Sequence, residues 1–391
     1  MNDRILLPVS MGVLERIEPT TWRVSASQDV AYEVRQVDGL FSLACRELLA
    51  CGGSEFSSLR QVVVIDERVD ALYGDKIRAY YNHHEVTAYI LTLPVSEESK
   101  DLDAALVIVR HLESVGVLRR SDPIIAIGGG VLLDLVGFAA GLYRRGVPYI
   151  KVPTNGMAMW DAAIGVKTAV NVLGRRNRLG SYHAPAIALL DRSFLRTVER
   201  RDLSNGMGEL LKLAVIKDAR LFNLLEHHSA MLLNSRFQDP IVAPEVIARA
   251  VDGMLEELAP NLWERTLERS VDFGHSFGPL LEMKALPELL HGEAVALDVL
   301  LSCWMARDRG MLSEEDVQRV IKVMRDMQLP LRHRFFEQPE LLMEALMDTM
   351  RHRNGQQRLP LPNGIGCCGF VNNVRLDDLK AAAREMANVG A

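Results

Sequence analysis

The stretch Pro123-Ile-Ile-Ala-Ile-Gly-Gly-Gly130 decides the fold class. A run of branched apolar residues that ends in glycines is typical of a buried parallel strand followed by a tight turn. Similar apolar runs stand upstream at 60–66 and 86–93, and helical periods follow them at 73–84 and 96–115. This alternation of strands and helices predicts a parallel sheet that is covered on both faces.

Outside this region the pattern changes twice. Near the N-terminus, 21–25 and 31–35 alternate in polarity, which predicts an exposed ribbon. From about Asp191 long helical periods dominate, at 208–233, 243–258, 288–309, 313–327 and 340–350, and strand signals return at 359–370. We therefore predict an α/β domain over 1–195 and a mainly helical domain over 196–391, packed closely against each other.

Composition narrows the class of protein. The chain has 391 residues, 48% of them hydrophobic, which is too apolar for disorder. A formal net charge of −6 argues against a nucleic-acid partner, which would need a concentrated basic face. Five cysteines without a CxxC pair indicate a reducing compartment, and the apolar run 294–306 is too short to cross a bilayer. We expect a cytoplasmic protein with no membrane partner.

Two features point to a phosphorylated ligand. Glycines 128–130 after a buried strand would let backbone amides approach a pyrophosphate, although three glycines are more often a tight loop. Asp66 at a strand end suits ribose hydroxyls or a helix cap. Cations and amides cluster between 143 and 177, which suits a phosphorylated substrate, whereas each of them alone would be read as charged surface.

The third feature is a candidate metal site. Glu209, His275 and His291 offer one carboxylate and two imidazoles, a three-ligand set that leaves a divalent ion open to substrate. Lys212 lies three residues after Glu209 and shares its helix face. A single histidine is more often a satisfied core residue, so the pattern gains weight from its combination with the other two features.

Taken together, Gly128-Gly-Gly-Val-Leu-Leu-Asp134, Tyr143-Arg-Arg-Gly146, Lys167-Thr168, Gly208-Glu209 and His291-Gly-Glu293 resemble motifs of the sugar phosphate cyclases, of which 3-dehydroquinate synthase is the best known. The resemblance spans nearly the whole chain. It implies an N-terminal parallel-sheet domain that binds NAD+, a C-terminal helical domain that binds Zn2+ or Co2+, a sugar phosphate substrate and a homodimer.

The resemblance also implies residue roles. The metal ligands would be Glu209, His275 and His291. The residues expected at the cofactor are Asp66, Glu97, Lys100, Gly129, Gly130, Val131, Asp134, Thr154, Asn155, Asp161, Lys167, Arg176 and Thr197. Those expected to bind or convert the substrate are Asp161, Lys167, Asn177, Lys212, Asp272, His352 and Arg145, the last reaching across the dimer.

Departures from 3-dehydroquinate synthase suggest a branch of the family. That enzyme has asparagine, histidine and arginine where this chain has Asp272, Pro279 and Glu268, and an acid in place of the arginine would repel a substrate carboxylate. The chain resembles the 2-epi-5-epi-valiolone synthases instead, in which Leu258, Asp272 and His352 would mark a sedoheptulose 7-phosphate pocket. The implied reaction is transient oxidation by NAD+, phosphate elimination, reduction, ring opening and intramolecular aldol closure.

Two segments fit neither branch. The chain reads Asn155-Gly-Met-Ala-Met-Trp160 where the family has threonine and branched aliphatics, and Arg176 stands where lysine is usual. Both are expected to line the cofactor pocket. They keep open a 2-epi-valiolone synthase or another sugar phosphate cyclase such as 3-dehydroquinate synthase, and further a metal-dependent alcohol dehydrogenase or a non-catalytic binding relative.

Overall fold

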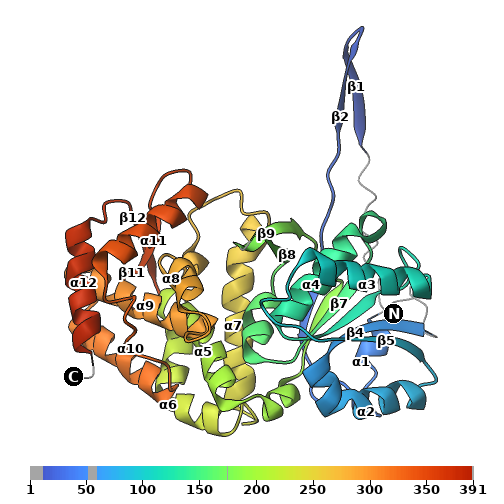
Figure 1. Ribbon diagram of the computed structural model, residues 1–391, viewed down its shortest axis with the longest axis horizontal. Coiled ribbons are helices and arrows are strands. Elements are labelled where there is room, and N and C mark those ends of the chain that lie inside the picture. The colour runs from blue at the N-terminus through green and yellow to red at the C-terminus, as the bar shows by residue number, and fades with distance from the viewer. Residues whose placement is uncertain (1–11, 52–59, 174, 390–391) are drawn as a thin grey trace.

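The computed structural model describes residues 12–51, 60–173 and 175–389, which form a sheet domain and a helical domain side by side (Figure 1). Six strands form one parallel sheet in the order β3-β10-β7-β6-β4-β5. Their bounds are β3 Glu33–Gln36, β4 Arg60–Asp66, β5 Thr87–Leu93, β6 Ile124–Gly128, β7 Tyr149–Pro153 and β10 Ile187–Leu190. The predicted α/β fold class is confirmed.

Both faces of this sheet are covered, as its continuous apolar strands require. In β4, Val62 and Val64 pack with helices α3 and α4, whereas Val63 and Ile65 pack with α2 on the other face. The helices and short turns of this domain are α1 Glu47–Ala50, α2 Glu67–His83, α3 Leu102–Val115, α4 Gly130–Leu142, η1 Tyr143–Arg145 and η2 Ala158–Ala162. A hairpin of β8 Lys167–Val172 and β9 Arg175–Tyr182 packs against α4.

The strand order reverses beside β4, because β4 leads outward to β5 while β6 leads to β7 on the other side. In open parallel sheets, ligands bind outside the carboxyl ends of the strands at such a reversal. Asp66 ends β4 and Gly128 ends β6, and a Cβ placed on Gly128 would lie 3.3 Å from the Cβ of Asp66. The glycine turn therefore stands at the expected ligand position.

The second domain is mainly helical, as predicted. Its elements are η3 Arg192–Thr197, α5 Arg200–Ile216, α6 Ala219–Asn234, α7 Val242–Leu258, η4 Ala259–Asn261, η5 Ser270–Asp272, α8 Gly278–Ala285, α9 His291–Asp308, α10 Glu314–Asp326, α11 Pro339–His352, β11 Leu359–Pro362, β12 Cys368–Val371 and α12 Leu376–Asn388. The proposed domain limit at 195/196 falls within η3 and stays a prediction. No helix in the described ranges has the length and apolar character needed to cross a membrane.

Helices α5 and α9 cross at two glycines. A Cβ on Gly208 would lie 2.2 Å from the carbonyl oxygen of Gly292, and a Cβ on Gly292 would lie 1.8 Å from that of Asn205. Any side chain at either position would push the two backbones apart. Because Glu209 follows Gly208 and His291 precedes Gly292, this close approach brings two of the predicted metal ligands together.

The prediction that 21–25 and 31–35 form one N-terminal ribbon is wrong, because each segment pairs with a different strand. Thr21–Ser25 forms β2 and pairs antiparallel with β1 Val13–Glu18, which the sequence reading missed. The second predicted ribbon strand instead becomes β3, which joins the main sheet beside β10 and half-buries Val34. Likewise the single helix expected over 208–233 is two helices, because Asp218 caps a new helix through the amides of Arg220 and Leu221.

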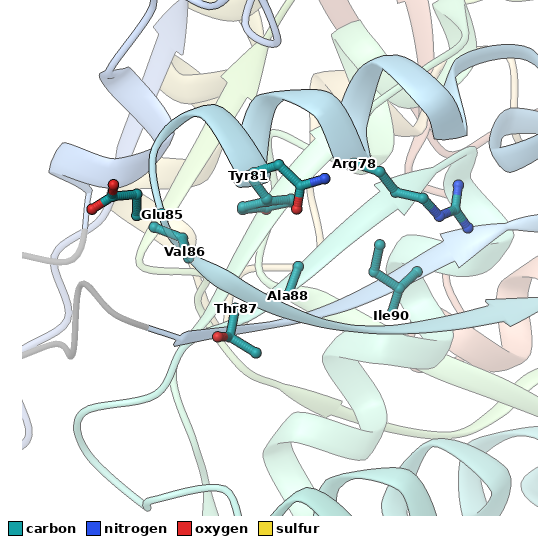
Figure 2. A pocket seen from close by; sticks show the side chains of 8 residues that line it. Arg78, Tyr81, Glu85, Val86, Thr87, Ala88 and Ile90 are labelled. Atoms are coloured by element: carbon teal, nitrogen blue, oxygen red, sulfur yellow. The ribbon is translucent and has the colours of Figure 1, made fainter.

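A hollow on the surface lies between α2 and β5, away from the reversal point (Figure 2). It is lined by Arg78, Tyr81, Asn82, Glu85, Val86, Thr87, Ala88 and Ile90. None of these residues belongs to the predicted cofactor, substrate or metal sets, so this hollow is not the site that the sequence predicts.

Gly208→Ala should destabilise the fold, because the added methyl group meets backbone that cannot rotate away. We expect a loss of about 1–3 kcal/mol in the free energy of unfolding, the usual cost of overpacking, measured by urea denaturation. The matched control is Gly253→Ala in α7, where a Cβ would meet its nearest atom at 3.7 Å. That variant should be neutral or slightly more stable. Equal effects of the two changes would contradict the crossing.

Candidate metal and cofactor site

Glu209, His275 and His291 meet in the helical domain. Glu209 lies on α5, His275 lies between η5 and α8, and His291 begins α9. One ligand atom from each lies within 4.8 Å of the others, and the Nε2 atoms of both histidines are 3.4 Å from Oε1 of Glu209. The predicted ligands thus form a carboxylate and two-imidazole cluster that suits a catalytic divalent ion.

Both imidazole rings are oriented through their other nitrogen. His275 Nδ1 lies 3.2 Å from the carbonyl oxygen of Phe273, and His291 Nδ1 lies 2.9 Å from Oε2 of Glu282. Each Nδ1–H donates to an oxygen, so the assigned tautomer leaves the Nε2 lone pair facing Glu209. Partners of this kind fix ring orientation and raise ligand basicity at metal sites.

Two polar side chains, one fully buried and one half-buried, hold the segments that carry the histidines. Asp298 on α9 is fully buried and accepts hydrogen bonds from the amides of Phe277 (2.6 Å) and Gly278 (2.8 Å), which ties the His275 segment to α9. Asn205 on α5 accepts from the amide of Gly292 at 2.7 Å. The rings are therefore positioned by backbone that side chains on two helices fix in place.

The charges of the cluster favour a bound cation. Glu209 is 1% exposed, and among the described residues neither of its oxygens has a hydrogen-bond donor, although Lys212 forms an ion pair with it. Burial raises the pKa of Glu209, but the charges of Lys212 and His275 bring that pKa well below its usual range. Burial lowers the pKa of His291, and the neighbouring carboxylates of Glu209 and Glu282 reverse this and raise it to about 10. A divalent ion would take the place of a proton on His291 and would offset the negative charge of Glu209, so the residues fit the metal.

The residues expected at the substrate phosphate lie on both domains. Lys167 begins β8, and its Nζ lies 2.6 Å from Oε1 of Glu264. Asn177 accepts a hydrogen bond from Lys100 at 2.7 Å. Lys212 is buried beside Glu209. Burial lowers the pKa of Lys212, but the charges of Glu209 and of Asp161 in η2 raise that pKa above its usual value.

Asp272 and its neighbours form a second charged group. Asp272 pairs with Arg269, and Nη2 of Arg353 lies 3.8 Å from its Oδ2. His352 ends α11 with an exposed side chain, and no polar contact among the described residues ties it to the metal triad. Arg145 is exposed in η1, beyond the end of α4 that is opposite the glycine turn. The roles of these residues remain predictions.

The glycine turn leaves little room for side chains on its own backbone. A Cβ on Gly129 would lie 2.7 Å from Nδ2 of Asn155, and one on Gly130 would lie 3.4 Å from the Cβ of Ala162. Gly129 is also the N-cap of α4, and Val131 lies in the first turn of that helix. Backbone amides at a helix N-terminus favour an anion, so the turn fits a dinucleotide.

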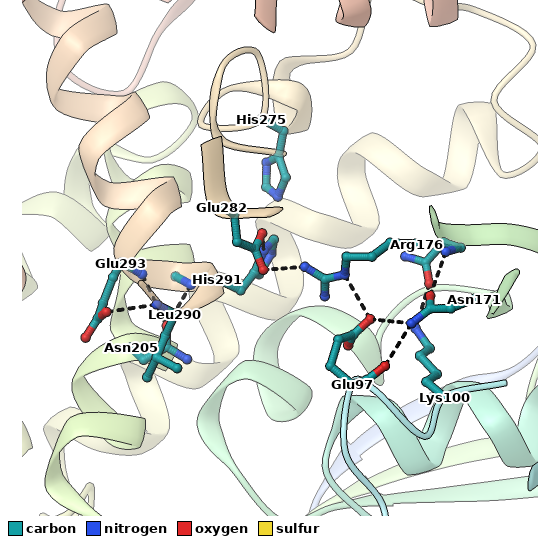
Figure 3. Close-up of polar contacts among 12 residues, drawn as sticks. Glu97, Lys100, Asn171, Arg176, Asn205, His275, Glu282, Leu290, His291 and Glu293 are labelled. Atoms are coloured by element: carbon teal, nitrogen blue, oxygen red, sulfur yellow. Dashed lines mark hydrogen bonds and ion pairs between the residues drawn. The ribbon is translucent and has the colours of Figure 1, made fainter. Parts of the chain in front are cut away.

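The remaining cofactor candidates surround this turn. Asp66 caps α2 by accepting from the amide of Arg68, and the amide of buried Thr154 donates to the carbonyl oxygen of Gly128 at 3.0 Å. Thr197 lies 2.9 Å from the hydroxyl of Tyr73. Lys100 donates to Asp134 at 2.5 Å, and Glu97 accepts from Asn171 and from Arg176 (Figure 3). Contact between each of these residues and NAD+ stays a prediction.

The unusual 155–160 segment departs from expectation. Met159 and Trp160 are fully buried, so the idea that they line the cofactor pocket is wrong. Trp160 packs on Phe237, and its Nε1 donates to the oxygen of Gly206 at 2.8 Å, which fastens the sheet domain to α5. Asn155 alone of these three stands beside the glycine turn, where it also accepts from the amide of Ala158.

Sequence reasoning missed several residues that support the site. Glu282, Asn205 and Glu264 contact the predicted ligands or their neighbours, yet none was singled out for a role. A signal existed for Asp298, because it interrupts an otherwise apolar helix run. A buried acid in such a run needs hydrogen-bond donors, which the His275 segment supplies.

Family models match most of the chain. Residues 90–205 match the N-terminal part of 3-dehydroquinate synthase, and residues 206–354 match its C-terminal part. The chain belongs to the 3-dehydroquinate synthase-like family of sugar phosphate cyclases. This confirms the resemblance drawn from the sequence motifs.

Curated members of this family are similar over nearly their full length. A 2-epi-5-epi-valiolone synthase of Streptomyces albus is 45% identical over 100% of this chain and 96% of its own. One from Actinoplanes sp. is 48% identical over 96% of this chain and 95% of its own. A 3-dehydroquinate synthase of Vibrio atlanticus is 31% identical over 84% of this chain and 90% of its own.

Solved structures agree with the fold. The 2-epi-5-epi-valiolone synthase of Streptomyces hygroscopicus subsp. jinggangensis 5008, with NAD+ and Zn2+ bound, has a TM-score of 0.88 and 47% identity, covering 94% of this chain and 99% of that one. An iron-containing alcohol dehydrogenase reaches a TM-score of 0.60 at 14% identity, covering 92% of this chain and 98% of its own. This second likeness shows the shared fold alone.

His275→Ala should weaken metal binding strongly, because it leaves an incomplete ligand set around Glu209. Metal content after dialysis against a weak chelator should fall well below that of the unaltered protein, and turnover should fall with it. His227→Ala is the control, since His227 lies exposed on α6 with its Nδ1 2.7 Å from the oxygen of Asn223. Normal metal content in His275→Ala would refute the ligand assignment.

Proposed function

We propose that this chain is a 2-epi-5-epi-valiolone synthase, which converts sedoheptulose 7-phosphate into the carbocycle with release of inorganic phosphate. The observation that carries the proposal is the cluster of Glu209, His275 and His291, with Asp272 three residues before His275. The identity of 45–48% to synthases of this type supports the choice of substrate.

The substrate is neutral apart from its phosphate, and the chain supplies cations for that group. Lys212 pairs with Glu209 of the cluster, and Lys167, Asn177 and Lys212 would hold the phosphate oxygens. Lys167 is paired with Glu264 at 2.6 Å. A dianionic phosphate would displace this carboxylate, because it offers more negative charge and more acceptor oxygens.

The chemistry requires an acidic proton at C6 before phosphate leaves C7, and a ketone at C5 provides that acidity. When bound, NAD+ would supply a reversible hydride acceptor and the divalent ion would polarise the substrate hydroxyls at the Glu209 cluster. Asp272, held by Arg269 and near Arg353, would accept a substrate hydroxyl proton in a hydrogen bond. The positive charge of Lys212 would stabilise negative charge that develops on substrate oxygens.

The proposal is tested by incubating the full chain with sedoheptulose 7-phosphate, NAD+ and Zn2+ or Co2+. We expect release of inorganic phosphate with no net accumulation of NADH, and a product NMR spectrum of 2-epi-5-epi-valiolone. Accumulation of NADH in step with product would indicate a simple alcohol dehydrogenase. Binding without phosphate release would indicate a non-catalytic relative, and the 2-epi-valiolone spectrum would indicate the other branch.

We further propose that the protein is a cytoplasmic homodimer, with Arg145 serving the partner's site. The hairpin of β1 and β2 extends away from the body of the protein (Figure 1). On one of its faces Leu14, Trp22 and Val24 are 57–74% exposed, while the other face carries the ion pair of Glu15 and Arg23. An isolated two-stranded ribbon is marginal in water, so an apolar face of this kind favours a partner surface.

Replacing Leu14 and Val24 together by aspartate should weaken the dimer, because both charges would lie on the apolar face of the hairpin. Light scattering across a concentration series should show a shift toward the monomer mass. Ser25→Asp adds a charge on the opposite face and serves as the control. An unchanged dimer in the double variant would exclude the hairpin from the interface, and a monomeric unaltered protein would refute the dimer itself.

A further inference from the structure

Glu282 lies behind the metal ligand His291. It is on α8, is 4% exposed, and its Oε2 is 2.9 Å from Nδ1 of His291. Its second oxygen, Oε1, accepts a hydrogen bond from Nη1 of Arg176 (Figure 3). Both oxygens of this buried carboxylate are thus occupied, one by a ligand ring and one by a guanidinium from the other domain.

Arg176 connects this carboxylate to the sheet domain. It lies on β9, and its Nε donates to Oε1 of Glu97 at 2.9 Å. Glu97 stands between β5 and α3, on the side of the predicted cofactor residues. The half-buried guanidinium therefore lies between two carboxylates that belong to different domains.

We infer that Arg176 and Glu282 are positioning residues for the metal site: Arg176 holds Glu282, and Glu282 orients His291 for the ion. The inference rests on the metal triad of the proposed function. It adds residues around that triad and keeps Glu209, His275 and His291 as the ligands. It differs from the sequence-based expectation that Arg176 contacts the cofactor directly.

The geometry gives each residue a separate task. Glu282 accepts a hydrogen bond on each of its two oxygens, which a carboxylate can do and a glutamine amide cannot, because an amide has one oxygen and an NH2 group that only donates. Arg176 must donate in two directions, toward Glu282 and toward Glu97, and the planar guanidinium fork does so without rotating. A lysine at this position would supply one compact charge and would not fix the direction of both carboxylates.

The test measures Zn2+ affinity of the full-length protein by competition with a chromophoric chelator, without substrate. Glu282→Gln should weaken Zn2+ binding by about 10–100-fold, the usual effect of removing a partner of a ligand histidine. Arg176→Met should weaken it by about tenfold although Arg176 does not touch the ion. In the Glu282→Gln background the Arg176 change should add little, because both act through one carboxylate.

Arg178→Met is the matched control. Arg178 is an exposed arginine on the same strand, and among the described residues it makes no hydrogen bond or ion pair, so Zn2+ affinity should not change. Arg176→Lys should recover part of the affinity lost in Arg176→Met. If Arg176→Met folds poorly, the Co2+ absorption spectrum of Arg176→Lys replaces it as the measurement. A spectrum that differs from that of the unaltered protein would show changed ligand geometry, and an identical one would count against a role of Arg176 at the metal.

Two results would overturn the inference. Zn2+ affinity in Glu282→Gln equal to that of the unaltered protein would remove Glu282 from the site. Unchanged Zn2+ affinity in Arg176→Met, together with weaker NAD+ binding by calorimetry, would assign Arg176 to the cofactor instead. Phosphate release at saturating Zn2+ is measured separately. A failure of the proposed reaction is thereby distinguished from a failure of Arg176 and Glu282 to position His291.

Discussion

The contact between the backbones of α5 and α9 at Gly208 and Gly292 is the constraint on which the site depends. Helices that carry side chains at their contact lie about 8–10 Å apart, whereas two glycines allow backbone to meet backbone. This contact places Glu209 and His291, each one residue from a glycine, on facing sides of the crossing. The third ligand, His275, joins them because Asp298 of α9 holds the segment that carries it.

The crossing buries the carboxylate of Glu209. The cost of burying this charge is reduced because positive and negative groups alternate around it. Glu209 is flanked by Lys212 and by two imidazoles, and His291 is flanked in turn by Glu282. An unpaired buried carboxylate would cost several kcal/mol, whereas a chain of opposite charges offsets most of that cost. The arrangement leaves both oxygens of Glu209 without a hydrogen-bond donor in the described part of the chain, and a bound cation would complete their coordination.

The sequence predicted the features that rest on local pattern. The parallel sheet followed from apolar runs such as 124–127, and the metal ligands followed from residue types in recognisable motifs. The ribbon partner was missed because β1 carries no strict alternation. The packing of Trp160 was missed because the resemblance to the family placed its segment at the cofactor pocket, whereas the side chain is fully buried in the core. Pairs such as Arg176 and Glu282 stand 106 residues apart, and no periodicity in one sequence relates such positions.

The hairpin of β8 and β9 explains why these long-range pairs gather in one place. It belongs to the sheet domain by its contacts with α4, yet its charged side chains reach the helical domain at two points. Lys167 meets Glu264 at one end, and Arg176 meets Glu282 near the other. The turn end of the same hairpin is held to the sheet domain, where Asn171 contacts Glu97. The hairpin therefore joins the sheet domain to the neighbours of Asp272 and to the partner of His291 through two separate ion pairs.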